Sequence, residues 1–231
     1  MQSLSLSKYN NLIEGAEALT SECVDGQVWP KVLRLEDQSI LKLFRLKRFI
    51  TSARLVPHVT RFQRHVKRLK ALNIPTVRIN VVYNIAAINR TAVHYWPLEG
   101  QTLREHCEIN PIEIDQAKRL GQFFLFLHQN GIYFRSIHFG NIVLTDDHRI
   151  GLIDVVDMRF RRRPLHIRLR IRNLRHLFRY DADIDCLAPV RHIFIDAYCA
   201  SARLHPRRER QLRCRFENYF QKRGQLLDKP A

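Results

Sequence analysis

The sequence predicts an α+β protein of two lobes, with a strand-rich N-terminal lobe and a helical C-terminal lobe. Apolar and polar residues alternate over 28–35 and 39–44, which is typical of strands. Helical periodicity covers 111–129 and most of 164–223. Strands gathered at the front of a chain and helices gathered at its back are typical of the α+β class.

The strand-rich lobe is also predicted to contain one helix. Over 57–72 the apolar residues recur on a single helical face, and Asn73-Ile74-Pro75 ends the helix. Strands are expected at 77–88 and 91–96, before a hinge at Pro97-Leu98-Glu99-Gly100. The expected boundaries are a single domain over 1–231, with an N-lobe over 20–97, a C-lobe over 98–223 and a frayed tail over 224–231.

Local signals place further elements in the helical lobe. Thr102 and Glu105 have the spacing of a capping box, which predicts a short helix that opens at Thr102. Two short strands, over 142–144 and 151–153, are expected around a turn at Asp146-Asp147-His148. The pair forms a hairpin in this prediction.

Composition excludes several classes of protein. The five cysteines are scattered and form no CxxC pair, which predicts neither a zinc ribbon nor a disulfide framework and favours a reducing cytoplasm. No apolar stretch approaches the roughly 20 residues that span a bilayer. The first residues show no secretory signal, so a cytoplasmic location is expected.

Charge is the unusual property of the chain. The formal net charge is +17, and residues 38–98 contain no Asp or Glu. A second basic block, over 159–179, holds nine arginines. Such a surface attracts polyanions, which here are nucleic acid, an anionic membrane or a phosphorylated glycolipid. A solvated basic face is the structural alternative.

One stretch carries recognisable chemistry. It runs from Gly131 through Tyr133-Phe-Arg-Ser-Ile-His-Phe-Gly-Asn141 and is followed by Gly151-Leu-Ile-Asp154. This pattern resembles the catalytic loop and metal-binding segment of the protein-kinase-like superfamily, with Arg135, Asn141 and Asp154 at matching positions. The resemblance implies a two-lobed kinase-like fold, in which Asn141 and Asp154 hold a Mg²⁺ ion that bridges the phosphates of ATP.

The resemblance extends upstream to the expected nucleotide site. Lys42, on the strand over 39–44, resembles the phosphate-binding lysine of kinase strand three. Gly26 is the only glycine in the region that corresponds to the nucleotide loop. Glu99 lies in a segment that looks like the post-hinge segment of small bacterial kinases. The resemblance therefore implies that Lys42, Gly26 and Glu99 contact ATP.

Within the superfamily, the chain is similar to bacterial lipopolysaccharide core kinases and "toluene tolerance" proteins. Segments that suggest this include Trp96-Pro-Leu-Glu-Gly100 and Leu152-Ile-Asp154 leading into Arg159-Phe-Arg-Arg-Arg163. The likeness implies phosphorylation of a lipopolysaccharide core sugar or a related anionic glycolipid. The protein would then lie peripherally at the cytoplasmic face of the inner membrane, with Arg161, Arg162 and Arg163 docking the anionic acceptor.

Departures from the kinase pattern are concentrated at the catalytic positions. Ser136 stands where the family has its catalytic aspartate, and a hydroxyl is a poor base near neutral pH. His138 stands at the position of the lysine that follows, either as a packed ring or as a phosphate contact and surrogate proton acceptor. In the kinase pattern, a glutamate on the helix after strand three pairs with the lysine. Residues 38–98 contain no Asp or Glu, and Gln63 or His65 occupies the corresponding region.

These departures leave two hypotheses from different classes. The first is an ATP-dependent phosphotransferase in which Arg135, Ser136 and His138 line the catalytic loop. The second is a pseudokinase, which would bind nucleotide or act as a scaffold without turnover. Nucleic-acid binding through the basic surface is a third and weaker alternative, because no RNA- or DNA-binding motif is present and no specific nucleic-acid partner is expected.

Overall fold

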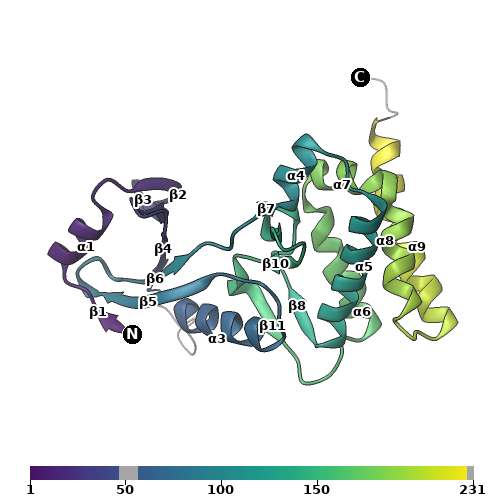
Figure 1. The fold of residues 1–231 in the computed structure, drawn as a ribbon, viewed down its shortest axis with the longest axis horizontal. Coiled ribbons are helices and arrows are strands. Elements are labelled where there is room, and N and C mark those ends of the chain that lie inside the picture. The colour runs from purple at the N-terminus through teal and green to yellow at the C-terminus, as the bar shows by residue number, and fades with distance from the viewer. Residues whose placement is uncertain (47–56, 228–231) are drawn as a thin grey trace. The chain divides into compact units, whose positions relative to one another are not determined.

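The computed structural model of the protein describes residues 1–46 and 57–227. Over these residues it has the α+β class that the segregation of strands and helices predicted. The chain divides into two compact units, Met1–Glu99 and Gly100–Ala231, hereafter the N-terminal and C-terminal units (Figure 1). Part of the acid-free run, 47–56, and the last residues of the predicted tail, 228–231, lie outside the described residues.

A six-stranded sheet forms the N-terminal unit, in the order β1-β5-β6-β4-β3-β2. The first strand is parallel to its neighbour and the other pairs are antiparallel. The strands are β1 (Gln2–Ser3), β2 (Glu17–Val24), β3 (Gln27–Arg34), β4 (Ile40–Arg45), β5 (Arg78–Ile85) and β6 (Arg90–Trp96), with helices α1 (Leu6–Ile13) and α3 (His58–Ala71).

The elements before β3 were not predicted. In β2 the side chains on both faces are mostly exposed, so its sequence lacks the apolar alternation that marks a half-buried strand. Strand β1 has only two residues, and α1 has eight. Short or fully solvated elements of this kind leave little periodic signal in a sequence.

Alternation along β4 sends its side chains to two different environments. Leu41 and Leu43 join an apolar cluster with Leu33, Ile85 and Tyr9 of α1. The intervening residues share the opposite face. On that face the ring of Phe44 lies 6.5 Å from that of Phe62 on α3, measured between centroids. Lys42, which is only 6% exposed, is therefore on the face that α3 covers.

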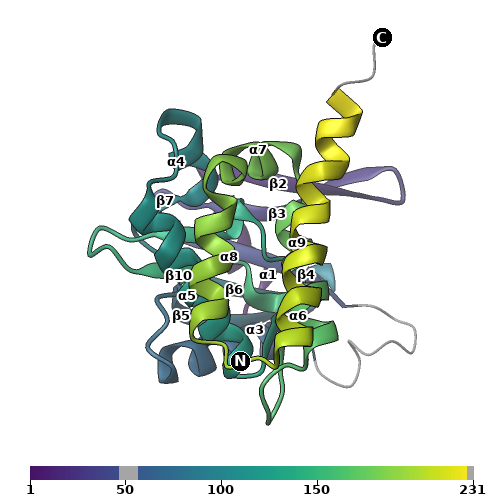
Figure 2. The same cartoon turned by 90° about the vertical axis from the view of Figure 1, so that its right-hand side faces the viewer.

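Six α-helices build most of the described part of the C-terminal unit. They are α4 (Leu103–Ile109), α5 (Ile114–Gln129), α6 (Ile167–Leu174), α7 (Asp181–Leu187), α8 (Arg191–Ala200) and α9 (Pro206–Leu227). Figure 2 shows α8 and α9 beside each other. Helix α9 continues to Leu227, so 224–227 are helical although the sequence suggested a frayed tail.

Aromatic rings and one glycine hold the helices together. The rings of Phe194 and Phe216 stack with centroids 5.4 Å apart, and Phe124 meets Phe194 edge to face. A Cβ on Gly121 would overlap the carbonyl oxygen of Phe194, so glycine allows α5 and α8 to approach closely. The apolar residues at 123–127 of α5 are mostly buried or half-buried, but Phe126 is 39% exposed.

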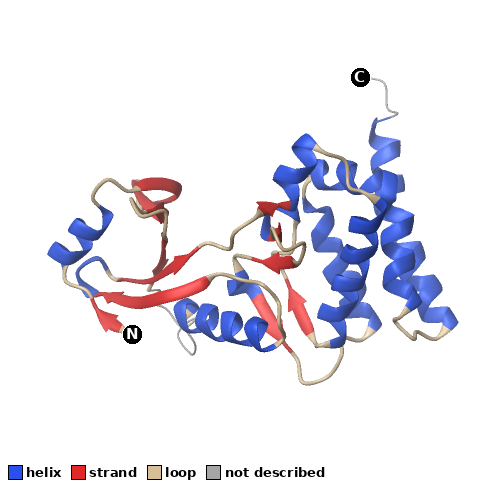
Figure 3. Cartoon of the chain, in the orientation of Figure 1, coloured by secondary structure: helices blue, strands red, loops and turns tan. Residues whose placement is uncertain are grey.

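The C-terminal unit also contains short strands, which Figure 3 shows in red. They flank the loop that runs from Arg135 to Asn141. The predicted hairpin is present as an antiparallel pair of three-residue strands, and the predicted capping box at Thr102 and Glu105 opens α4. A second antiparallel pair, between residues 132–134 and 158–160, was not predicted. The strands are β7 (Gln101–Thr102), β8 (Ile132–Phe134), β9 (Ile142–Leu144), β10 (Ile150–Leu152) and β11 (Met158–Phe160), in the orders β10-β9-β7 and β11-β8.

A disulfide joins Cys107 of α4 to Cys186 of α7, although the scattered cysteines predicted no disulfide framework. The two cysteines are 79 residues apart, so they belong to no local spacing motif. Cys23, Cys199 and Cys214 are free thiols. In the described part of the chain, no helix combines the length and apolar character needed to cross a membrane.

Candidate functional site

The segment that carries the kinase-like pattern begins on β8, which is held by hydrogen bonds on both sides. One side pairs with β11, where Phe134 lies opposite Met158. On the other side Asn173 of α6 takes the place of a strand. Its Nδ2 donates to the carbonyl of Phe134 at 2.7 Å, and its Oδ1 accepts the Phe134 amide at 3.3 Å. The start of the loop is therefore fixed by one buried amide side chain.

A buried histidine holds Asn173 in turn. His128 Nε2 lies 3.2 Å from Asn173 Oδ1, and His128 Nδ1 lies 2.7 Å from the hydroxyl of Tyr198. Because Oδ1 can only accept, Nε2 carries the proton and Nδ1 accepts from Tyr198. Burial, and next the nearby Arg170 guanidinium, lower the pKa of His128 to about 3. His128 is therefore a neutral structural group near neutral pH.

The next part of the loop is anchored by Asp183 of α7, which is 2% exposed. Its Oδ2 accepts the backbone amide of Phe139 at 3.0 Å. Arg104 of α4 pairs with the same carboxylate through Nε and Nη2, both at 2.9 Å. A bidentate pair of this kind fixes geometry as well as charge. Asp183 therefore joins α4, α7 and the loop at one point.

Tyr180 completes this cluster. The Arg104 guanidinium lies over the Tyr180 ring, 4.3 Å from its centroid, and the His138 ring meets Tyr180 edge to face at 5.0 Å. Arg104, Tyr180 and Asp183 were all missed by sequence reasoning. They lie far from the loop along the chain and match no local motif, so only the fold brings them together.

Asn141 is oriented by its own loop. Its Nδ2 donates to the carbonyl of Ser136 at 2.8 Å and contacts His138 Nε2 at 3.1 Å. Both Nδ2 contacts direct the amide nitrogen into the loop. Oδ1 is then the atom of this side chain that suits a cation, since amide oxygens are among the hard ligands of Mg²⁺.

His138 is poorly placed as a proton acceptor in this arrangement. Its Nε2 accepts from Asn141, and its Nδ1 is buried without a hydrogen-bond partner among the described residues. Burial, followed by the charge of Arg104, lowers the pKa of His138. Both ring nitrogens are thus engaged or enclosed, which agrees with a packed ring rather than with a group that meets substrate.

The hairpin brings Asn141 and Asp154 to the same end. Ile142 lies opposite Leu152 in the β9–β10 pair, and the amide of Ile153 donates to the carbonyl of Asn141 at 3.1 Å. Asp154 follows directly and has φ 49° and ψ 48°, in the left-handed region. Only a few residue types adopt this conformation readily, Asn and Asp among them. Asp154 is exposed and lies at the same end of the hairpin as Asn141.

A second carboxylate, that of Asp157, lies next to Ser136. Ser136 Oγ donates to Asp157 Oδ2 at 3.2 Å, and the amide of Arg135 meets the carbonyl of Asp157 at 3.4 Å. Asp157 is exposed. The sequence does not indicate its contact with the loop, because that contact depends on the β8–β11 pairing that was not predicted.

A magnesium ion at this end would rely on few protein ligands. Within 1–46 and 57–227, no three His, Cys, Asp or Glu side chains gather into a metal site. Mg²⁺ is commonly held by one or two protein oxygens, with phosphates and water completing its octahedron. Asn141 and Asp154 fit this requirement only if a phosphorylated ligand supplies the remaining oxygens.

The predicted nucleotide-binding residues belong to the N-terminal unit. Lys42 lies on β4 between Val32 and Val93 of the neighbouring strands. Gly26 has φ +79° in the two-residue turn that joins β2 and β3, beside Asp25 at φ 52°. Paired positive φ values of this kind make a tight hairpin turn. Glu99 ends the unit and is exposed.

The basic block is not uniform. Arg161, Arg162 and Arg163 are exposed between β11 and α6, and the amide of Arg161 donates to the carbonyl of Gly131 at 2.9 Å. Arg170 is 6% exposed and donates through Nε to the carbonyl of Leu165 at 2.7 Å. The first three are available to an anionic partner, whereas Arg170 is structural.

No model of a known protein family matches the chain, and no curated protein matches it significantly.

Proposed function

We propose that the protein is a kinase-like phosphotransferase with a β-rich N-lobe and a helical C-lobe. It uses ATP and Mg²⁺ to phosphorylate a lipopolysaccharide core sugar or a related anionic glycolipid. The observation that carries the proposal is the end of the β9–β10 hairpin, where the amide of Asn141 is oriented from within its loop and Asp154 follows in a left-handed turn. This pair suits a Mg²⁺ ion that is shared with phosphates.

Each residue has a distinct part in this proposal. Asn141 and Asp154 hold the metal, and Lys42 meets the α- and β-phosphates. The metal, when bound, neutralises charge on the transferred phosphoryl group. Asp157 accepts a hydrogen bond from Ser136, which stands at the position of the missing base, and it receives the proton of the acceptor hydroxyl. Arg161, Arg162 and Arg163 attract the acceptor and the anionic membrane surface at the cytoplasmic face of the inner membrane.

A pseudokinase is the second candidate, and two observations favour it. Ser136 stands at the position of the usual base, and residues 38–98, which include α3, contain no Asp or Glu. In a pseudokinase, the same hairpin end would bind nucleotide or nothing, and the basic surface would recruit the protein to a membrane.

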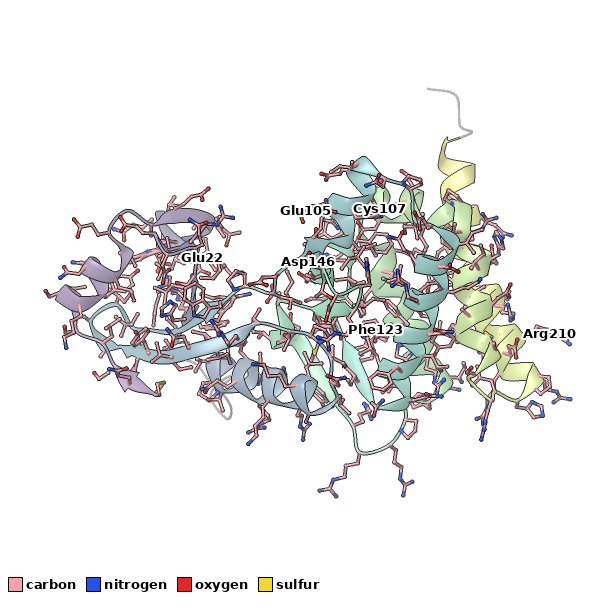
Figure 4. All side chains as sticks on the ribbon, viewed as in Figure 1. Glu22, Glu105, Cys107, Phe123, Asp146 and Arg210 are labelled. Atoms are coloured by element: carbon pink, nitrogen blue, oxygen red, sulfur yellow. A yellow bond between two sulfur atoms is a disulfide. The ribbon has the colours of Figure 1, made fainter. Side chains whose placement is uncertain are left out.

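Calorimetric titration of ATP with and without Mg²⁺ tests the metal pair. Wild type is expected to bind ATP in a Mg²⁺-dependent manner, and Asp154→Asn should lose that dependence because asparagine keeps the left-handed turn but removes the charge. Asp146→Asn is the matched control, because Asp146 is an exposed aspartate at the opposite end of the same hairpin (Figure 4). Lys42→Ala should weaken ATP binding with or without metal. Absence of ATP binding by wild type would end the enzyme proposal.

Turnover with purified core oligosaccharide separates the two candidates. In an active enzyme, Asp157→Asn should lower the rate by about 10²–10⁴-fold, the usual contribution of a general base. Ser136→Ala should change the rate little, since it leaves the carboxylate in place. Mg²⁺-dependent ATP binding without transfer to any glycolipid would favour the pseudokinase.

A further inference from the structure

The disulfide lies one helical turn from the residues that anchor the loop. On α4, Cys107 follows Arg104 by three residues, and on α7, Cys186 follows Asp183 by three. Residues three apart lie on the same face of a helix. The covalent bond and the Arg104–Asp183 ion pair therefore clamp the same contact between α4 and α7 (Figure 4 labels Cys107).

Without the covalent bond, few groups would hold this contact. Each helix has seven residues, and the buried residue of α4 is Leu103. The Arg104 side chain is 30% exposed in its ion pair with Asp183. The bidentate ion pair fixes the geometry of this contact but is noncovalent, so it does not tie the two helices together once they separate. The disulfide is the covalent link between the helix of Arg104 and the helix of Asp183.

We propose that Cys107 and Cys186 form a reversible thiol–disulfide site that controls how firmly Asp183 holds the loop at Phe139. In reduction, a dithiol attacks one sulfur and the Sγ–Sγ bond breaks. Two electrons and two protons pass from the dithiol to the two cysteines, which become thiols, while the dithiol becomes a disulfide. In oxidation by glutathione disulfide, the two cysteines lose two protons and two electrons, and two glutathione thiols form.

The surroundings of this pair allow it to react, and it forms the one disulfide among the described residues. Cys107 and Cys186 are both partly exposed, so a small dithiol can reach the bond. Cys199 is buried, and burial raises its pKa to about 11, so it supplies little thiolate. In proteins of reducing compartments, disulfides are usually transient and redox-sensing rather than permanent.

Amide hydrogen exchange of the whole chain tests the proposal, after thiols have been counted under denaturing conditions. Oxidised protein should expose three thiols and reduced protein all five. Reduction with dithiothreitol should speed exchange of the Phe139 amide by at least about tenfold, because that amide is protected by its bond to Asp183. Glutathione disulfide should restore the protection. Amides of the β2–β3 hairpin in the N-terminal unit should not respond.

Two variants complete the design. Cys107→Ser with Cys186→Ser should reproduce the fast exchange without any reductant, and Cys214→Ser, which removes an exposed free thiol, should behave as wild type. Five thiols in protein treated with glutathione disulfide would overturn the proposal, because no bond would form. Equal exchange of the Phe139 amide in oxidised and reduced wild type would overturn it as well, whatever the stability of the double variant.

Discussion

Most strands of the N-terminal unit are six to eight residues long, whereas those of the C-terminal unit have two or three residues. Long strands satisfy their backbone through one another. The short strand β8 and the loop after it depend instead on side chains from distant helices, at Asn173 and Asp183. The C-terminal unit should therefore be the more sensitive of the two to single substitutions and to acid.

The unfolding of the two units can be measured separately, because each dominates a different spectroscopic signal. Both tryptophans, Trp29 and Trp96, belong to the N-terminal unit, so intrinsic fluorescence follows that unit. Most of the helix belongs to the C-terminal unit, so the far-ultraviolet circular dichroism signal mainly follows that one. Unfolding in urea monitored by both signals shows which unit a change has affected.

The largest effect is expected for Asn173→Ala. The change leaves the amide and carbonyl of Phe134 and the Nε2 proton of His128 without partners in a buried site. Each unsatisfied buried group costs about 1–3 kcal/mol, so the C-terminal unit should lose about 3 kcal/mol or more. Asn218→Ala on α9 is the control and should cost less than about 0.5 kcal/mol. Equal loss in both variants would show that Asn173 does not act as a substitute strand.

Acid should destabilise the C-terminal unit by a somewhat smaller amount. The pKa of His128 is about 3 in the folded protein, below its ordinary value of 6.5. The unfolded chain therefore binds the proton more readily, so this stability is complete above pH 6.5 and is lost as the pH falls toward 3. At pH 5 the loss is about 2 kcal/mol. His128→Gln should flatten the dependence between pH 6.5 and 5 in urea titrations, and an unchanged slope would assign it to other groups.

Local patterns in the sequence predicted the parts of the fold that are locally determined. The helix of Phe62, the capping box at Thr102 and the β9–β10 hairpin are all present. The contacts of Asn173 and Asp183 with the loop were not predictable. They join residues 39 and 44 positions apart through single side chains, which leave no periodic pattern in the sequence. The residues of the candidate metal pair were identified from a motif, but their supports were not.

Replacement of exposed arginines should have the smallest effect on stability, in contrast to changes at the buried Asn173 and His128. Replacing Arg161, Arg162 and Arg163 with serine should change unfolding by less than about 0.5 kcal/mol, because their side chains are solvated. Binding to vesicles that contain anionic lipid should weaken, by up to about 1 kcal/mol for each arginine at low salt. The difference from wild type should shrink at physiological ionic strength, where exposed charges are screened within about 8 Å.

A matched triple variant decides whether position or net charge matters. Arg207, Arg208 and Arg210 on α9 are also exposed, and their replacement with serine removes the same charge from a chain of net charge +17. If the segment after β11 is the membrane-facing surface, only the first triple variant should lose vesicle binding. Equal losses would mean that the whole basic surface attracts the membrane, and Arg161, Arg162 and Arg163 would then have no special part in docking an acceptor.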